Sequence, residues 1–135
     1  MTAHASKIAH LPNHQPRQPA HIITSDAEAI SVAKQVASEI AKEAILRDQE
    51  RRLPRKELDL FSSSGLWGIT VPKEYGGAFV SNKTLAEVIA TVAEADPSIG
   101  QIPQNHLYMV EGLRLDGTEF KKKYFYELVL QGVRF

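Results

Sequence analysis

An all-α fold is predicted by three features of this sequence. Apolar residues recur at intervals of three and four positions, as on one face of a helix, most clearly between residues 81 and 96. Residues that commonly begin helices, namely Ser25, Ser81 and the pair Asp96-Pro97, stand directly before such stretches. Alternation of apolar and polar residues, which would indicate a strand, is missing from the sequence after residue 24.

The composition is that of one ordinary domain without electrostatic bias. A chain of 135 residues is expected to bury one core. Its 16 Lys and Arg residues balance 16 Asp and Glu residues, so no overall charge attracts nucleic acid or an acidic membrane. Cysteine is absent, which excludes a disulfide framework and a cysteine nucleophile. Because the first twenty residues hold no apolar stretch of the kind found in secretion signals, we expect a cytoplasmic protein with neither nucleic-acid nor membrane partners.

Residues 1–24 are polar, interrupted by prolines and without periodicity, which predicts a flexible arm. Four histidines lie in it, but their spacing matches no common zinc pattern, so no metal site is predicted. These histidines are His4, His10, His14 and His21. The helical domain is accordingly expected to span residues 25–135.

Five helices are expected in that domain. The first begins at Ser25, where Glu28 completes a capping-box pattern, and it carries a stripe of mostly small apolar residues before the charged residues 47–52. That stripe consists of Ala29, Ala33, Val36, Ile40 and Ala44. The second helix is shorter and runs from Pro54 to a closing glycine, Gly65. Its inward residues are expected to be Leu58 and Phe61.

Residues 66–80 are predicted to be irregular, because Val71-Pro72 demands extended backbone and Gly76-Gly77 favours positive φ angles. Trp67 and Tyr75 are expected to attach this segment to the core. Stacking of Trp67 on a cofactor is the alternative.

The last three helices follow Ser81, Asp96 and the turn at residues 116–118. Pro103 lies inside the fourth, so a kink or a restart at Ile102 is expected there. On the fifth helix, two aromatic residues, a leucine and a glutamine form a stripe along one face, with two apolar residues beside it. The stripe is Phe120, Tyr124, Leu128 and Gln131, and the residues beside it are Phe125 and Val129.

The residues alone show no catalytic constellation, and the densest polar cluster lies at residues 101–106. Gln101 and Asn105 stand four positions apart, so on a helix their amides share a face and could orient a polar ligand. His106 falls near an apolar stripe. It is either a partly buried histidine bonded to backbone or a pocket residue.

Two blocks resemble the N-terminal helical domain of the acyl-CoA dehydrogenase superfamily of flavoenzymes. They are residues 65–77, GLWGITVPKEYGG, and residues 95–106, ADPSIGQIPQNH. The second block is similar to a branch linked to sulfur acquisition, which includes flavin-dependent monooxygenases of organosulfur compounds. The resemblance extends over about residues 19–135 and implies a FAD or FMN cofactor in the parent enzyme.

The resemblance places Gln101, Asn105 and His106 at positions facing the pocket in front of the flavin. Some relatives carry histidine where this chain has Gln101 and tyrosine where it has Asn105, so no acid–base role is carried over. An amide can orient a substrate oxygen but is not a general base near neutral pH.

The resemblance implies either oxidation of an acyl thioester or oxygenation of sulfur, and the block at residues 95–106 favours the second. The family's flavin-binding β-domain and C-terminal helical bundle would follow Phe135. We therefore expect an isolated or truncated N-terminal domain, inactive and without bound flavin on its own. It would associate with itself through the fifth helix or with the missing flavoenzyme domains. The alternative is a non-enzymatic helical interaction or oligomerisation module, and a helix-turn-helix DNA binder is disfavoured by the zero net charge.

Overall fold

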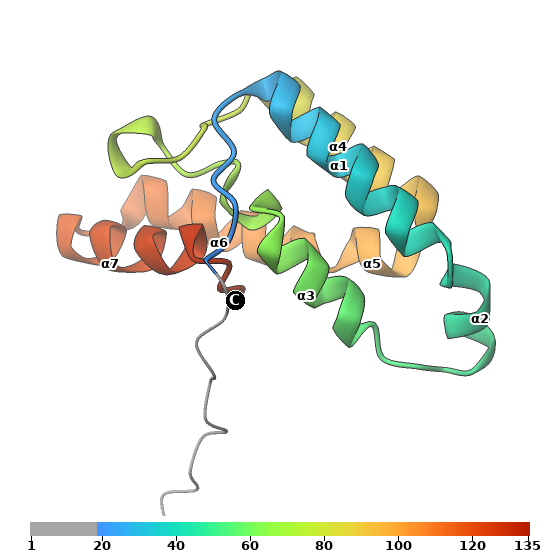
Figure 1. Ribbon diagram of the computed structural model, residues 1–135. Coiled ribbons are helices and arrows are strands. Elements are labelled where there is room, and N and C mark those ends of the chain that lie inside the picture. The colour runs from blue at the N-terminus through green and yellow to red at the C-terminus, as the bar shows by residue number, and fades with distance from the viewer. Residues whose placement is uncertain (1–18) are drawn as a thin grey trace, which may run out of the picture.

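The computed structural model describes residues 19–135 of the chain. Every regular element in this part is a helix, as Figure 1 shows, so the predicted all-α class is confirmed. The α-helices are α1 (Asp26–Ala41), α2 (Ala44–Gln49), α3 (Arg55–Ser63), α4 (Asn82–Ala95), α5 (Pro97–Gln101), α6 (Pro103–Asp116) and α7 (Glu119–Leu130). Two short 3-10 helices, η1 (Leu66–Gly68) and η2 (Lys73–Tyr75), lie between α3 and α4. Against the five expected helices, α2 is additional, and the fourth is divided into α5 and α6.

The helices form two pairs around a common core (Figure 1). α1 packs along α4, while α7 lies beside α6, and η1 contacts α1, α3, α6 and α7. Trp67 of η1 and Phe61 of α3 are both buried, with ring centroids 4.4 Å apart. The core is therefore centred on η1, where both helix pairs meet.

Small side chains bring α1 and α4 together, as the stripe on the first helix predicts. Ala29 and Ala33 of α1 are fully buried, as are Val88 and Val92 of α4. At the N-terminal ends, the Asp26 carboxylate accepts hydrogen bonds from the Oγ of Ser81 and the Oγ1 of Thr84, each at 2.7 Å. Because the first residues of both helices are joined in this way, α1 and α4 run parallel.

The capping box at the start of α1 forms only in part. The Glu28 backbone N–H donates to the Oγ of Ser25, as expected. The Glu28 carboxylate does not return to the Ser25 backbone. It accepts instead from the backbone N–H and the hydroxyl of Thr24, at 2.7 and 2.8 Å.

The segment before α1 takes part in the fold from residue 19 onward. Residues 1–18 of the expected arm lie outside the described residues, as do His4, His10 and His14. Ile23 belongs to the core, and the His21 backbone N–H donates to the carbonyl of Ser63 at 2.9 Å. The packed part of the chain therefore begins before residue 25.

The loop at residues 66–80 is irregular, as predicted, and folds back on itself. Gly76 has a φ of 92°. Gly77 is needed for a different reason, because a Cβ there would lie 2.0 Å from the Val71 carbonyl oxygen. The Trp67 indole N–H donates to the Ser62 hydroxyl at 2.9 Å inside the core. This geometry supports the packing role of Trp67 over stacking on a cofactor.

The stripe expected on the fifth helix proves to be the outer face of α7. Phe120 is 79% exposed and Tyr124 is 54% exposed, whereas Tyr126 and Val129 are buried. Tyr126 faces α6, where its hydroxyl lies 3.5 Å from the Val110 carbonyl oxygen. No helix within residues 19–135 has the length and apolar character needed to cross a membrane.

Candidate functional site

The polar cluster at residues 101–106 lies where α5 passes into α6. Pro103 carries no backbone N–H, so the hydrogen-bond pattern of α5 stops and α6 begins, with Ile102 between them. Ile102 keeps helical dihedral angles, φ −63° and ψ −40°, so the chain continues along a helical path. The predicted restart at Ile102 is confirmed.

Gln101 and Asn105 are both exposed at this junction. Gln101 is the last residue of α5, and its side-chain amide donates to the Oε1 of Gln104 at 2.7 Å. Asn105 lies in the first turn of α6. The two candidate residues therefore present amide groups, which both donate and accept hydrogen bonds, on an open surface.

His106 lies in the core instead, with only 1% of its surface exposed. Its Nδ1 accepts from the Phe135 backbone N–H at 3.2 Å, which requires Nδ1 to be unprotonated. The proton is then on Nε2, which donates to the Trp67 carbonyl at 3.0 Å. Burial lowers the pKa of His106, and the hydrogen bond to Trp67 offsets this only in part. The geometry favours the first alternative for His106, a neutral histidine bonded to backbone.

Three surface hollows lie away from this junction. The largest, about 1040 Å³, follows α1 and α3 between His21 and Ser64. Another, of about 740 Å³, lies beside α2 and the start of α5, and the third, of about 640 Å³, lies between η2 and α7. Gln101 and Asn105 line none of the three. For the flavin implied by the family resemblance, these amides suit one wall of a site, and they do not enclose it.

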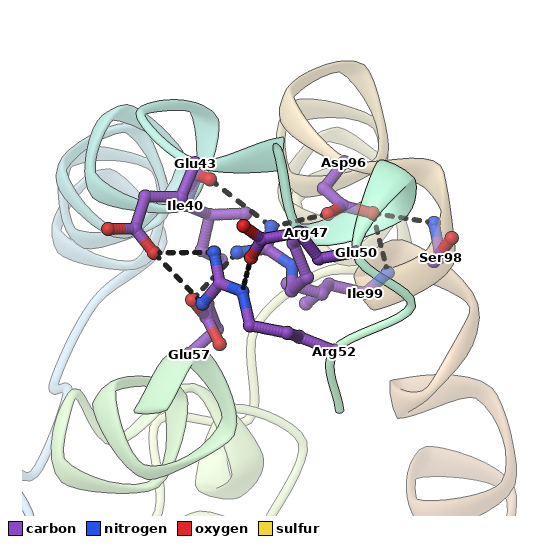
Figure 2. Close-up of polar contacts among 9 residues, drawn as sticks. All are labelled: Ile40, Glu43, Arg47, Glu50, Arg52, Glu57, Asp96, Ser98 and Ile99. Carbon is purple, nitrogen blue, oxygen red and sulfur yellow. Dashed lines mark hydrogen bonds and ion pairs between the residues drawn. The ribbon is translucent and has the colours of Figure 1, made fainter. Parts of the chain in front are cut away.

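At the N-terminal end of α5, opposite Gln101, lies a buried ion network that the sequence interpretation missed (Figure 2). Arg47 of α2 is only 4% exposed. Its guanidinium donates to Glu57 at 2.7 Å, to Asp96 at 2.5 Å and to the Ile40 carbonyl at 3.3 Å. The position of Arg47, seven residues after Ile40 and three after Ala44, continues the apolar stripe of the first helix. This spacing is the sequence feature from which the burial of Arg47 could have been predicted.

Asp96 links this network to the candidate residues. Its Oδ2 accepts from Arg47, while its Oδ1 accepts from the backbone N–H groups of Ser98 and Ile99, at 2.9 and 3.2 Å. Burial raises the pKa of Asp96. The hydrogen bonds from Arg47, Ile99 and Ser98, together with the positive charge of Arg47, outweigh burial and hold this pKa below its ordinary value. Asp96 is therefore an ionised cap on the helix that ends in Gln101.

Comparison with known proteins decides the family. The family described as acyl-CoA dehydrogenase, N-terminal domain, matches residues 26–132. The chain belongs to this family. The expected membership is thus confirmed over nearly all of the described residues.

The relatives include monooxygenases as well as acyl-CoA dehydrogenases. Dibenzothiophene monooxygenase from Rhodococcus erythropolis is 29% identical over 107 residues, which make up 79% of this chain and 26% of the relative. A probable acyl-CoA dehydrogenase, fadE25 of Mycobacterium bovis, is 36% identical over 85 residues, or 63% of this chain and 22% of the relative. The crystal structure of FMN-bound TdsC from Paenibacillus sp. A11-2 is similar with a TM-score of 0.67 at 30% identity, covering 76% of this chain and 26% of that one. The chain thus spans about a quarter of the length of these relatives.

Proposed function

We propose that this domain forms the helical N-terminal part of a flavin-dependent monooxygenase that oxidises an organosulfur compound. The observation that carries the proposal is the match to dibenzothiophene monooxygenase and to FMN-bound TdsC, which covers 79% and 76% of this chain. The match to the acyl-CoA dehydrogenase covers 63%. FMN, the flavin named for TdsC, is accordingly the expected cofactor, with FAD as the alternative.

In this proposal the domain orients the substrate, and the flavin supplies the redox chemistry when bound. Gln101 and Asn105 are the groups that would face the substrate, because their amides are exposed and can hold a polar atom in place. His106 supports them from the core, where it joins α6 to η1 and to Phe135.

A second candidate is a helical interaction or oligomerisation module with the same fold. The exposed aromatic side chains Phe120 and Tyr124 on α7 favour this function, since large apolar groups on a surface commonly mark an interface. A homo-oligomer, or an assembly with flavoenzyme domains, would cover them.

The proposed function is tested by transplanting the domain. We would replace the matching quarter of TdsC with residues 19–135, supply the chimera with reduced FMN and oxygen, and measure oxidation of dibenzothiophene. Alanine at Gln101 or Asn105 is expected to lower turnover by about tenfold or more, because substrate orientation contributes to the barrier. Melting temperature should stay within about 2 °C, because exposed side chains contribute little to stability.

Gln35→Ala is the matched control, since it removes an exposed amide on α1, away from the proposed pair. Normal turnover in the Gln101 and Asn105 variants of an active chimera would remove these residues from the site. A folded chimera that binds FMN but oxidises no substrate would contradict the monooxygenase proposal. The interaction module would then be the remaining candidate function.

The domain alone is expected to bind FMN weakly, because its candidate groups form only one wall. Isothermal titration calorimetry of the 135-residue chain with FMN measures this directly. Stoichiometric binding at low micromolar concentration would show that the helical domain is a flavin site in its own right.

A further inference from the structure

The guanidinium of Arg47 lies where three helices end or begin. Ile40 is one of the last residues of α1, so its carbonyl has no partner within that helix. Glu57 lies in the first turn of α3, and Asp96 caps α5. Arg47 therefore satisfies a carbonyl at a C-terminal end and pairs with carboxylates at two N-terminal ends (Figure 2).

The two oxygens of Asp96 have separate tasks. One accepts from Arg47, and the other accepts from the first free N–H groups of α5. A carboxylate held on one side by a planar guanidinium has a defined orientation, and so has the helix that it caps. Since α5 is only five residues long, its own hydrogen bonds cannot define its direction.

α5 is the element that carries Gln101. It continues directly into α6, where Asn105 lies in the first turn. A tilt of α5 about its cap would displace the Gln101 amide relative to Asn105. Productive alignment in a site depends on such small displacements.

We propose that Arg47 is a positioning residue: through the Asp96 cap it fixes the direction of α5 and thereby the place of the Gln101 amide. The role of Arg47 in catalysis rests on the function proposed above. Its effect on the direction of α5 is independent of that function. Arg47 touches neither Gln101 nor Asn105 and acts only through Asp96 and the backbone of α5.

A buried ion network of this kind need not stabilise the domain. Buried ion pairs gain little over neutral groups of similar size, because removing the charges from water offsets their attraction. Loss of one partner, in contrast, leaves uncompensated charge. A test must therefore separate the stability of the domain from the direction of α5.

The test uses three variants of the 135-residue chain, followed by nuclear magnetic resonance. Arg47→Met removes the charge. A triple variant, Arg47→Met with Glu57→Gln and Asp96→Asn, neutralises the whole network and avoids a buried unpaired carboxylate. Arg52→Met is the control, because Arg52 is a nearby arginine that pairs with Glu43 and Glu50 at the surface.

We expect amide exchange at Ser98 and Ile99 to accelerate by about tenfold or more in Arg47→Met and in the triple variant. Exchange at core amides of α1 and α4 reports the stability of the whole domain and should have the wild-type rate in the triple variant. The side-chain amide resonance of Gln101 should shift in both variants and stay in place in Arg52→Met. Unchanged exchange at Ser98 and Ile99, or an unmoved Gln101 resonance, in both variants would overturn the proposal.

The same variants in the TdsC chimera test the link to turnover. With the triple variant, turnover is expected to fall by about tenfold while FMN affinity and melting temperature are retained. Full turnover in that variant would overturn the catalytic part of the inference. An inactive wild-type chimera would instead count against the proposed function, and the exchange measurements would still decide whether Arg47 positions α5.

Discussion

At the scale of single residues, His106 shows how burial changes the role of a histidine. Histidine is the side chain whose charge most readily changes near neutral pH. Here both ring nitrogens are bonded to backbone groups, of Trp67 and Phe135, which are 39 and 29 positions away in the sequence. The ring also stacks on Phe135, with centroids 5.5 Å apart. His106 therefore joins three separate segments and depends on remaining neutral.

This geometry predicts that the domain loses stability as the pH falls below about 6.5, the ordinary pKa of histidine. Burial lowers the pKa in the folded state, so the unfolded chain binds more protons below that pH. The contribution of neutral His106 is complete above the unfolded pKa. It diminishes as the pH falls through the folded value. Melting temperatures measured between about pH 7.5 and about pH 5.5 should therefore decline.

His106→Gln should flatten this decline, whereas His21→Gln should not, because His21 is a half-exposed histidine whose Nε2 lies 2.6 Å from the Glu28 carboxylate. An equally steep decline in His106→Gln would assign the pH dependence to other groups. Protonation would also remove the acceptor for the Phe135 N–H, so resonances of residues 131–135 should move over the same pH range.

At the scale of elements, the contact between α4 and α5 depends on a single glycine. A Cβ at Gly100 would lie 2.6 Å from both the Cα and the Cβ of Ala93, a distance that requires one helix to move. Ile99 beside it is fully buried. α5 can therefore lie close to α4 only because residue 100 has no side chain.

Gly100→Ala is expected to destabilise the domain by about 1–3 kcal/mol, as overpacking of a core does. Gly112→Ala is the matched control, since it makes the same change inside α6 at a position with open space around the added carbon. That control should instead stabilise the domain by about 0.5–1 kcal/mol, through helix propensity. Urea unfolding of the two variants measures both effects. Equal free energies of unfolding would show that α5 is not closely held against α4.

At the scale of the whole molecule, apolar side chains remain exposed on the pair α6 and α7. Tyr108 and Met109 of α6 are 74% and 55% exposed, and Phe120 of α7 is 79% exposed. A second exposed group, Ile45 and Leu53, lies near α2 at the other end of the domain (Figure 1). Exposed apolar groups of this size commonly become buried by association.

We predict that the chain forms a homodimer or a higher oligomer through α7 or the helices after Pro97. Light scattering over a concentration series should show a mass that rises with concentration. Replacing both Phe120 and Tyr124 with serine should shift the chain toward the monomer, because it removes apolar area from the contact. The same exchange at Ile45 and Leu53 is the control and should leave the association unchanged. A monomer at high micromolar concentration in the wild-type chain would contradict the prediction.

Features that depend on near neighbours were predictable from the sequence. The start of α1 at Ser25, the start of α4 at Ser81 and the restart before Pro103 each follow from residues within about four positions of one another. The blocks at residues 65–77 and 95–106 likewise identify the family from the sequence. Helical periodicity and these local signals together predict the fold class.

Only the tertiary structure decided which polar groups are buried and which apolar face is covered. Arg47 opens the charged stretch at residues 47–52, yet it is buried because it pairs with Glu57 and Asp96, 10 and 49 positions away. On α7 the periodicity allows more than one inward face, and contact with α6 selects the face that carries Tyr126. The physical reason is common to both cases. Local propensity and capping act within one or two turns, whereas burying a charge or a face depends on partners that meet only when the helices pack.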